Sequence, residues 1–196
     1  AFHLGRHIIG YEMQMVMAAV DYFESRSARG EPELPIGVAG YGEGGLIALY
    51  TSAVDQRIDA TLVSGYFEGR EKMWKEPLYR SVWGFLEEFG DARVAGLIAP
   101  RPLVIEASRG PGDLDTFRQR LRDRDTSAAA RLATPLLESV KRELEIARVP
   151  YARLGISDRI SLVTTGSDGA GMPGSTEAVT AFLRQLGREG PPPEHG

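Results

Sequence analysis

The sequence predicts an α/β fold in which helices cover both faces of a parallel sheet. Short apolar runs near residues 36–40, 60–65, 102–107 and 159–164 alternate with longer segments of helical periodicity, which is typical of strand–helix–strand units. The run at 36–40 has no alternating polar residue, as expected of a strand buried on both faces. We therefore expect the four runs to form one parallel sheet with right-handed connections.

The segments between the runs have the apolar spacing of amphipathic helices. Helices are expected over residues 7–26, 43–54, 85–98, 132–147 and 176–186, with a break near Gly90 in the third. In the first, apolar residues such as Ile8, Met13, Val20 and Phe23 recur on one face, and we interpret that face as core packing.

Two segments lack a clean period. Residues 66–83 are aromatic and charged, and such an excursion after a strand is where α/β proteins place elements that cover a site. Its aromatic side chains either line a pocket mouth or pack the excursion onto the body; they are Tyr66, Phe67, Trp74, Tyr79 and Trp83. Residues 109–130 are dense in Arg and Asp, which indicates a solvated loop and a salt-bridged helix.

The chain of 196 residues is long enough for one domain with a sizeable core. We expect a single domain over residues 1–187 and a disordered, proline-rich tail over 188–196. The sequence opens on a helical pattern without an initiator Met or a signal peptide, whereas α/β folds usually begin with strands. This pattern indicates a cut inside a larger protein, so that the first strands are lacking; a processed terminus would give the same pattern. It leaves the compartment and the oligomeric state open.

Composition excludes several classes of function. A net charge of −4 argues against nucleic acid or an anionic membrane as partner, and no apolar run is long enough to span a bilayer. The chain has no cysteine, and its three histidines lie at positions 3, 7 and 195. These are too few and too close to the termini for a histidine-based metal centre. We expect no metal and no cofactor.

The turn after the first apolar run carries the clearest motif. Gly40 and Gly44 occupy the outer positions of a G-x-S-x-G nucleophile elbow between a strand and a helix, and Gly42 occupies the central one. The surrounding elbow residues are Tyr41, Glu43 and Gly45. The motif predicts a positive φ at Gly42. It also predicts that Gly42→Ser is sterically tolerated, at a cost in stability of about 1 kcal/mol.

Two other interpretations of this turn remain open. If Glu43 were central, the bulky Tyr41 would fall on the crowded inner side of the turn. Gly40, Gly42 and Gly45 also match a G-x-G-x-x-G dinucleotide pattern. That pattern requires an acidic residue about 20 positions further on, where Glu68 stands in a different setting.

Three blocks of sequence resemble the α/β hydrolases, and more narrowly the acetyl xylan esterase and dienelactone hydrolase-like families. The blocks are residues 5–10 with 18–23, residues 36–45, and the Ala-Pro-Arg-Pro link with its flanking helix and strand at 91–105. The resemblance implies a partial α/β-hydrolase fold and a serine, acid and histidine that act together on an ester. It also implies a small ester or carbohydrate as ligand.

The resemblance places this triad on particular positions. The serine falls on Gly42, so the nucleophile slot is vacant. The acid region contains Asp113 and Asp115, while Glu106 lies still within the strand. The histidine region at 164–171 contains no histidine, and His195 comes too late to fill it.

Two further residues are alternative candidates. Glu43 begins a helix, where the dipole favours a negative charge. We interpret it as an acid in the first helical turn, and a carboxylate nucleophile is the alternative. His7 could serve as an unusual base, but a lone histidine at a helix start is more often structural.

These observations predict an esterase-related chain without triad-based activity. One alternative is an active ester hydrolase that uses groups from an absent N-terminal segment or an unrecognised site. The other is a binding or scaffold domain that keeps the fold without the chemistry.

Overall fold

The structure is a computed structural model, and it describes residues 6–27, 29–71, 76–113 and 132–187. The predicted tail at 188–196 lies outside the described residues. So do Trp74, Asp115 and His195.

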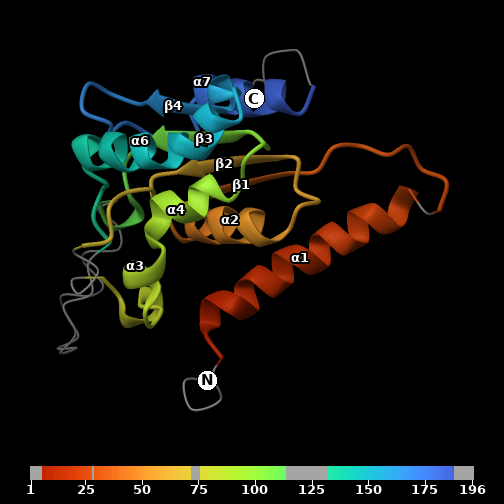
Figure 1. The fold of residues 1–196 in the computed structure, drawn as a ribbon, viewed down its shortest axis with the longest axis horizontal. Coiled ribbons are helices and arrows are strands. Elements are labelled where there is room, and N and C mark those ends of the chain that lie inside the picture. The colour runs from red at the N-terminus through yellow and green to blue at the C-terminus, as the bar shows by residue number, and fades with distance from the viewer. Residues whose placement is uncertain (1–5, 28, 72–75, 114–131, 188–196) are drawn as a thin grey trace.

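Four parallel strands form the centre of the molecule (Figure 1). They are β1 (Gly37–Tyr41), β2 (Ala60–Ser64), β3 (Leu103–Ala107) and β4 (Ile160–Thr164), in the sheet order β1-β2-β3-β4. The predicted parallel sheet is confirmed, and each predicted run coincides with a strand to within one or two residues. The register aligns Tyr41 with Ser64 and Ser64 with Glu106, so the carboxyl ends of three strands lie side by side.

Helices cover both faces of this sheet, as predicted. The helices are α1 (Ile8–Ser27), α2 (Glu43–Val54), α3 (Phe85–Glu88), α4 (Gly90–Gly96), α6 (Leu137–Arg153) and α7 (Thr176–Gln185). Short 3-10 turns occur at η3 (Leu78–Arg80), η4 (Pro111–Asp113) and η5 (Ser157–Arg159). The expected break at Gly90 separates α3 from α4, and Gly90 has a φ of 68° there.

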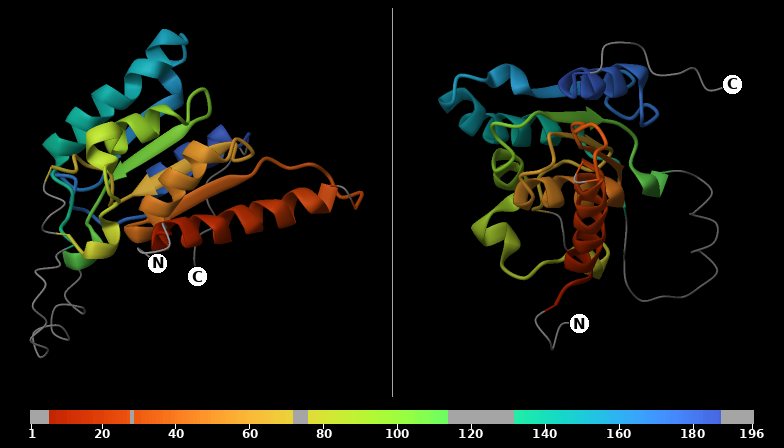
Figure 2. Two further views of the ribbon diagram at one scale, coloured as in Figure 1. Left: turned by 60° about the horizontal axis from the view of Figure 1, so that its bottom comes forward. Right: turned by 90° about the vertical axis from the view of Figure 1, so that its right-hand side faces the viewer.

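The core has two parts because the strand side chains alternate between the faces. On one face Val63, Leu103 and Ile105 pack with residues of α2, α4 and α6. On the other, Leu62 and Val104 pack with Phe182 and other residues of α7. Both layers can be followed in the two views of Figure 2.

The helix predicted over 132–147 was wrong at both ends. It begins at Leu137 and continues through Pro150 to Arg153. A proline inside a helix removes one backbone donor and usually ends the helix. Here the Pro150 ring packs against Gly96 of α4, where an added β-carbon would lie 3.0 Å from its Cγ, and Leu154 still donates to the Pro150 carbonyl.

Helix α1 is only partly buried. Ile9 and Val20 are almost fully covered, and α1 contacts α2. Ile8 and Phe23, which were assigned to the core face, are 46% and 50% exposed. The interpretation of the whole face as core packing was therefore wrong. Among the described helices, none is long and apolar enough to cross a membrane.

Candidate functional site

The turn at the carboxyl end of β1 has the strained geometry that the motif predicts. Gly42 has φ 55° and ψ −117°, a combination that residues with a side chain rarely adopt. Its N–H donates to the Ser64 carbonyl at 2.9 Å, and its own carbonyl accepts from Leu46 at 3.0 Å, so one residue ends the pairing with β2 and begins α2. The positive φ falls on Gly42, while Glu43 is already helical.

Close backbone approach explains one of the two outer glycines. A β-carbon at position 40 would lie 2.0 Å from the Gly44 carbonyl oxygen, so only glycine fits there. Gly44 itself has nothing within 4 Å of such an atom. The tight packing of this turn therefore depends on Gly40.

The space above Gly42 is filled by a proline. A β-carbon at position 42 would lie 2.8 Å from Cγ of Pro111 and 3.1 Å from its Cδ. The expectation that Gly42→Ser is sterically tolerated was therefore wrong, because a serine requires Pro111 and its 3-10 turn to move. Sequence reasoning could not find this contact, since the two residues are distant in the chain.

Glu43 is engaged by the excursion that follows β2. Its carboxylate accepts hydrogen bonds from the Tyr79 hydroxyl at 2.5 Å and from Arg80 Nε at 2.7 Å. It also forms an ion pair with Nη2 of Arg80. Burial and then the Glu43 carboxylate raise the pKa of the Tyr79 hydroxyl. These contacts agree with an acid in a helical first turn that anchors a neighbouring segment.

A buried polar cluster lies behind this contact. The Tyr50 hydroxyl donates to Asp91 Oδ1 at 2.8 Å, and Arg70 Nε lies 4.0 Å from Asp91 Oδ2. Arg70 and Arg80 both lie over the Tyr66 ring, with Cζ at 5.7 Å and 5.3 Å from its centroid. Burial is the main cause of the raised pKa of Asp91.

Two of the aromatic residues of the excursion pack onto the body, which is one of the two roles considered. Tyr66 and Phe67 are buried, whereas Trp83 is 92% exposed and Tyr79 is partly exposed.

Glu106 is the carboxylate at the carboxyl end of β3. Its side chain is buried and accepts hydrogen bonds from the Ser64 hydroxyl and from the backbone N–H groups of Gly174 and Ser175, both at 2.8 Å. Ser64 also lies 3.0 Å from the Ser108 hydroxyl. These donors fix the start of α7 to the end of the sheet, a role that the sequence did not reveal.

The remaining predicted site residues take other positions. Asp113 is the last residue of η4, and Asp115 lies outside the described residues. His7 Nδ1 accepts from the Ile9 N–H at 3.3 Å and so caps α1. The segment at 165–171 closes on itself, with the Gly171 N–H donating to the Thr165 carbonyl at 2.9 Å. In the described part of the chain, no group of three or more histidine or acidic residues is arranged to hold a metal ion.

The parallel sheet and its sharp strand-to-helix turn define a fold of the α/β-hydrolase type. Comparison with solved structures agrees. The chain is similar to a candidate acetyl xylan esterase from Bacteroides fragilis NCTC 9343, with 16% identity and a TM-score of 0.57 over 82% of this chain and 37% of that one. It is also similar to a glucuronoyl esterase from Solibacter usitatus, with 14% identity and a TM-score of 0.54 over 89% of this chain and 47% of that one.

These similarities confirm the predicted resemblance to α/β-hydrolase-type esterases at the level of the fold. The chain spans less than half the length of either structure. No protein-family model matches its sequence, and no curated protein matches it.

Proposed function

We propose that this chain is an esterase-related domain of the α/β-hydrolase type that does not hydrolyse esters through a triad of its own. One observation carries the proposal. The strained residue at the end of β1 is a glycine, and the Pro111 ring lies where a side chain at position 42 would begin. A nucleophile at this point needs both a side chain and open space for a substrate carbonyl.

The surrounding groups support the same conclusion. A serine nucleophile needs a base that accepts its proton, and the sequence has no histidine between residues 8 and 194. The buried Glu106 is occupied by three structural donors, and Glu43 is occupied by Tyr79 and Arg80.

For the ligand we propose a small ester or a carbohydrate, held without turnover near the carboxyl end of the sheet. The partly exposed Tyr79 contacts Glu43 there, and the exposed Trp83 belongs to the same excursion. Exposed aromatic rings of this kind offer an apolar face beside polar groups. The names of the two similar structures, both of them esterases of carbohydrate type, suggest the same class.

Hydrolysis of p-nitrophenyl acetate and labelling by a fluorophosphonate test the proposal together. The expected result is turnover no faster than a control protein of similar size and no labelled serine. Turnover that survives further purification, accompanied by covalent labelling, would refute the proposal and favour an active hydrolase with a different site.

A further inference from the structure

The segment that contains η3 has an inverted distribution of side chains. Its charged residue Arg80 is 7% exposed, whereas Leu78 and Trp83 are 86% and 92% exposed. Val82 is partly buried and packs against the core. A surface segment usually buries its large apolar side chains and leaves its charges in water. Residues 76–83, which we call the strap, are therefore attached mainly through polar groups.

Ion pairs and hydrogen bonds hold the strap against the start of α2. Arg80 donates to the Glu43 carboxylate through Nε at 2.7 Å and through Nη2, and the Tyr79 hydroxyl donates to the same carboxylate. At the beginning of the strap, Glu76 Oε2 lies 2.8 Å from Arg70 Nη1. Arg70 also donates to the Arg80 carbonyl at 3.3 Å. These contacts form one connected latch.

Such a latch is less costly to open than apolar packing of the same size. Opening exposes the apolar surface of Val82, but it returns Arg80 and Glu76 to water, which restores the hydration of two charged groups. The Glu43 side chain is 37% exposed even when the strap is closed, so solvent and salt screen its pair with Arg80. Segments with few buried apolar contacts open locally at free energies below that of global unfolding.

A conformationally free residue stands at the end of the strap. Gly84 has φ 70°, and nothing lies within 4 Å of the position that a β-carbon would occupy. It directly precedes α3, in which Phe85 stacks on Tyr50 with 5.2 Å between the ring centroids. That contact keeps α3 with the core. A change of φ and ψ at Gly84 can therefore swing the strap without moving α3.

We propose that the strap opens as a unit around Gly84 while the sheet stays folded, and that the pair between Glu43 and Arg80 sets its open fraction. Opening frees the Glu43 carboxylate, which directly follows the strained Gly42. The strap therefore controls access to the start of α2, and raised ionic strength shifts it toward the open form. The opening does not require the ligand proposed above, because every contact of the latch lies within the chain itself.

Hydrogen exchange of single amides tests this proposal. The Arg80 amide donates to the Pro77 carbonyl at 2.9 Å inside the strap, and the Thr61 amide donates to the Pro102 carbonyl at 3.1 Å in the sheet. The Arg80 amide should exchange through an opening of lower free energy than the one that exposes the Thr61 amide. Raising NaCl from about 50 mM to about 500 mM should speed its exchange about threefold relative to the Thr61 amide.

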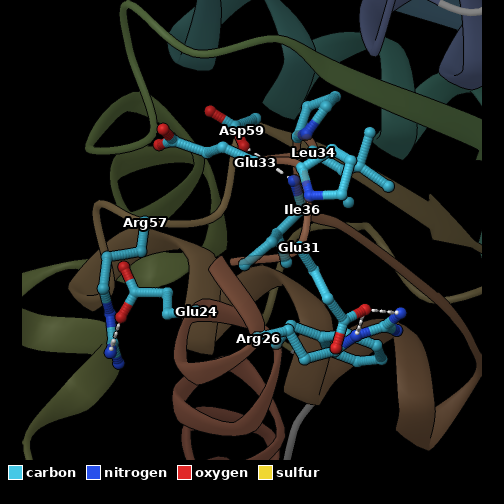
Figure 3. Close-up of a pocket in the computed structure, with 12 residues that line it drawn as sticks. Glu24, Arg26, Glu31, Glu33, Leu34, Ile36, Arg57 and Asp59 are labelled. Carbon is cyan, nitrogen blue, oxygen red and sulfur yellow. Dashed lines mark hydrogen bonds and ion pairs between the residues drawn. The ribbon is translucent and has the colours of Figure 1, made fainter. Parts of the chain in front are cut away.

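Two variants separate the latch from a general loss of charge. Glu43→Gln removes the charge but keeps an oxygen acceptor, so the Arg80 amide should exchange about fivefold faster relative to the Thr61 amide. This variant should also lose the salt dependence. Glu24→Gln is the matched control. Glu24 lines a pocket beyond the opposite end of α2, where it lies 2.7 Å from Arg57 (Figure 3), and its replacement should leave the Arg80 amide unchanged.

Three results would overturn the proposal. The first is exchange of the Arg80 amide at the same free energy as the Thr61 amide, which would mean that the strap opens only when the domain unfolds. The second is faster exchange that is equal in the wild type and in Glu43→Gln, because the latch would then not set the open fraction. The third is an equal acceleration of both amides in Glu43→Gln, which would assign Glu43 to the global stability of the domain.

Discussion

Ser64 and Glu106 are register partners on β2 and β3, and the serine hydroxyl donates to the glutamate carboxylate inside the protein. The same carboxylate accepts the backbone N–H groups of Gly174 and Ser175. One buried side chain therefore joins two strands and the start of α7.

Replacing Glu106 should be strongly destabilising. Glu106→Ala removes the acceptor of the Gly174 and Ser175 N–H groups and leaves the buried Ser64 hydroxyl with Ser108 alone, and we expect the free energy of unfolding to fall by about 3 kcal/mol. Glu106→Gln keeps one acceptor oxygen and should cost about half as much. Urea unfolding measures both changes. Glu138→Ala is the control, because Glu138 is exposed and pairs only with Lys141 at the surface; a similar loss in this control would contradict the assignment.

Replacing Gly42 and Gly44 by alanine should change the free energy of unfolding in opposite directions. Gly42→Ala combines an unfavourable φ with a contact to Pro111 and should destabilise by about 2 kcal/mol. Gly44 lies in the first turn of α2 with open space around it, so Gly44→Ala should stabilise by up to about 1 kcal/mol. Thermal unfolding of the two variants, side by side, checks this. Equal effects would mean that the turn is not strained at Gly42.

Serine at position 42 should not restore ester hydrolysis. Without a positioned base its hydroxyl stays protonated and weakly nucleophilic, and Pro111 occupies part of the space it needs. Gly42→Ser should hydrolyse p-nitrophenyl acetate no faster than the parent chain. Adding a histidine between Gly166 and Gly171 is expected to give at most a trace. Activity in the single variant would mean that another residue acts as base, with His7 the first to be replaced.

Arg80 should be important for anchoring the excursion. Its side chain is almost fully buried between Glu43 and the Tyr66 ring. Arg80→Ala leaves the Glu43 carboxylate without its cationic partner. The free energy of unfolding, measured in urea, should fall by about 2 kcal/mol. Arg80→Lys should recover little, because an ammonium cannot form the two parallel N–H···O bonds that the guanidinium makes to Glu43. Lys141→Ala, at an exposed pair, should change stability by less than about 0.5 kcal/mol.

Asp91 should make stability depend on pH. The pKa of this carboxyl is raised above its unfolded value, and burial is the largest cause of the shift. A raised pKa means that the contribution of Asp91 to stability is complete at low pH and is lost as pH rises through the folded value. Asp91→Asn removes that loss, so the stability of the variant relative to the wild type should increase from about pH 4 to about pH 7. A difference that stays constant between these pH values would show that Asp91 ionises as easily in the folded state as in the unfolded one.

The strands and the turn were predictable because local patterns determine them. Apolar runs bounded by turn residues mark strands. Glycine adopts the φ of position 42 without strain, and the close approach at position 40 leaves no room for a β-carbon. The end of α6 was missed because Pro150 is accommodated by a neighbour, Gly96, that no local pattern reveals.

The surroundings of the turn depend on contacts between distant residues. Pro111 meets Gly42, and Asp91 meets Tyr50, across long stretches of chain. A single sequence gives no signal for such pairs. The glycine at the centre of the turn was visible in the sequence, whereas its contact with Pro111 was visible only in the structure.

The attachment of Glu106 to the start of α7 also has a consequence for synthesis on the ribosome. Two of the three donors to this carboxylate belong to residues 174 and 175, which are synthesised after all four strands. A nascent chain that ends before them has a carboxylate at the sheet without these donors, and the apolar side chains of Leu62 and Val104 lack the cover of Phe182. The sheet therefore reaches its final stability only when α7 has left the exit tunnel.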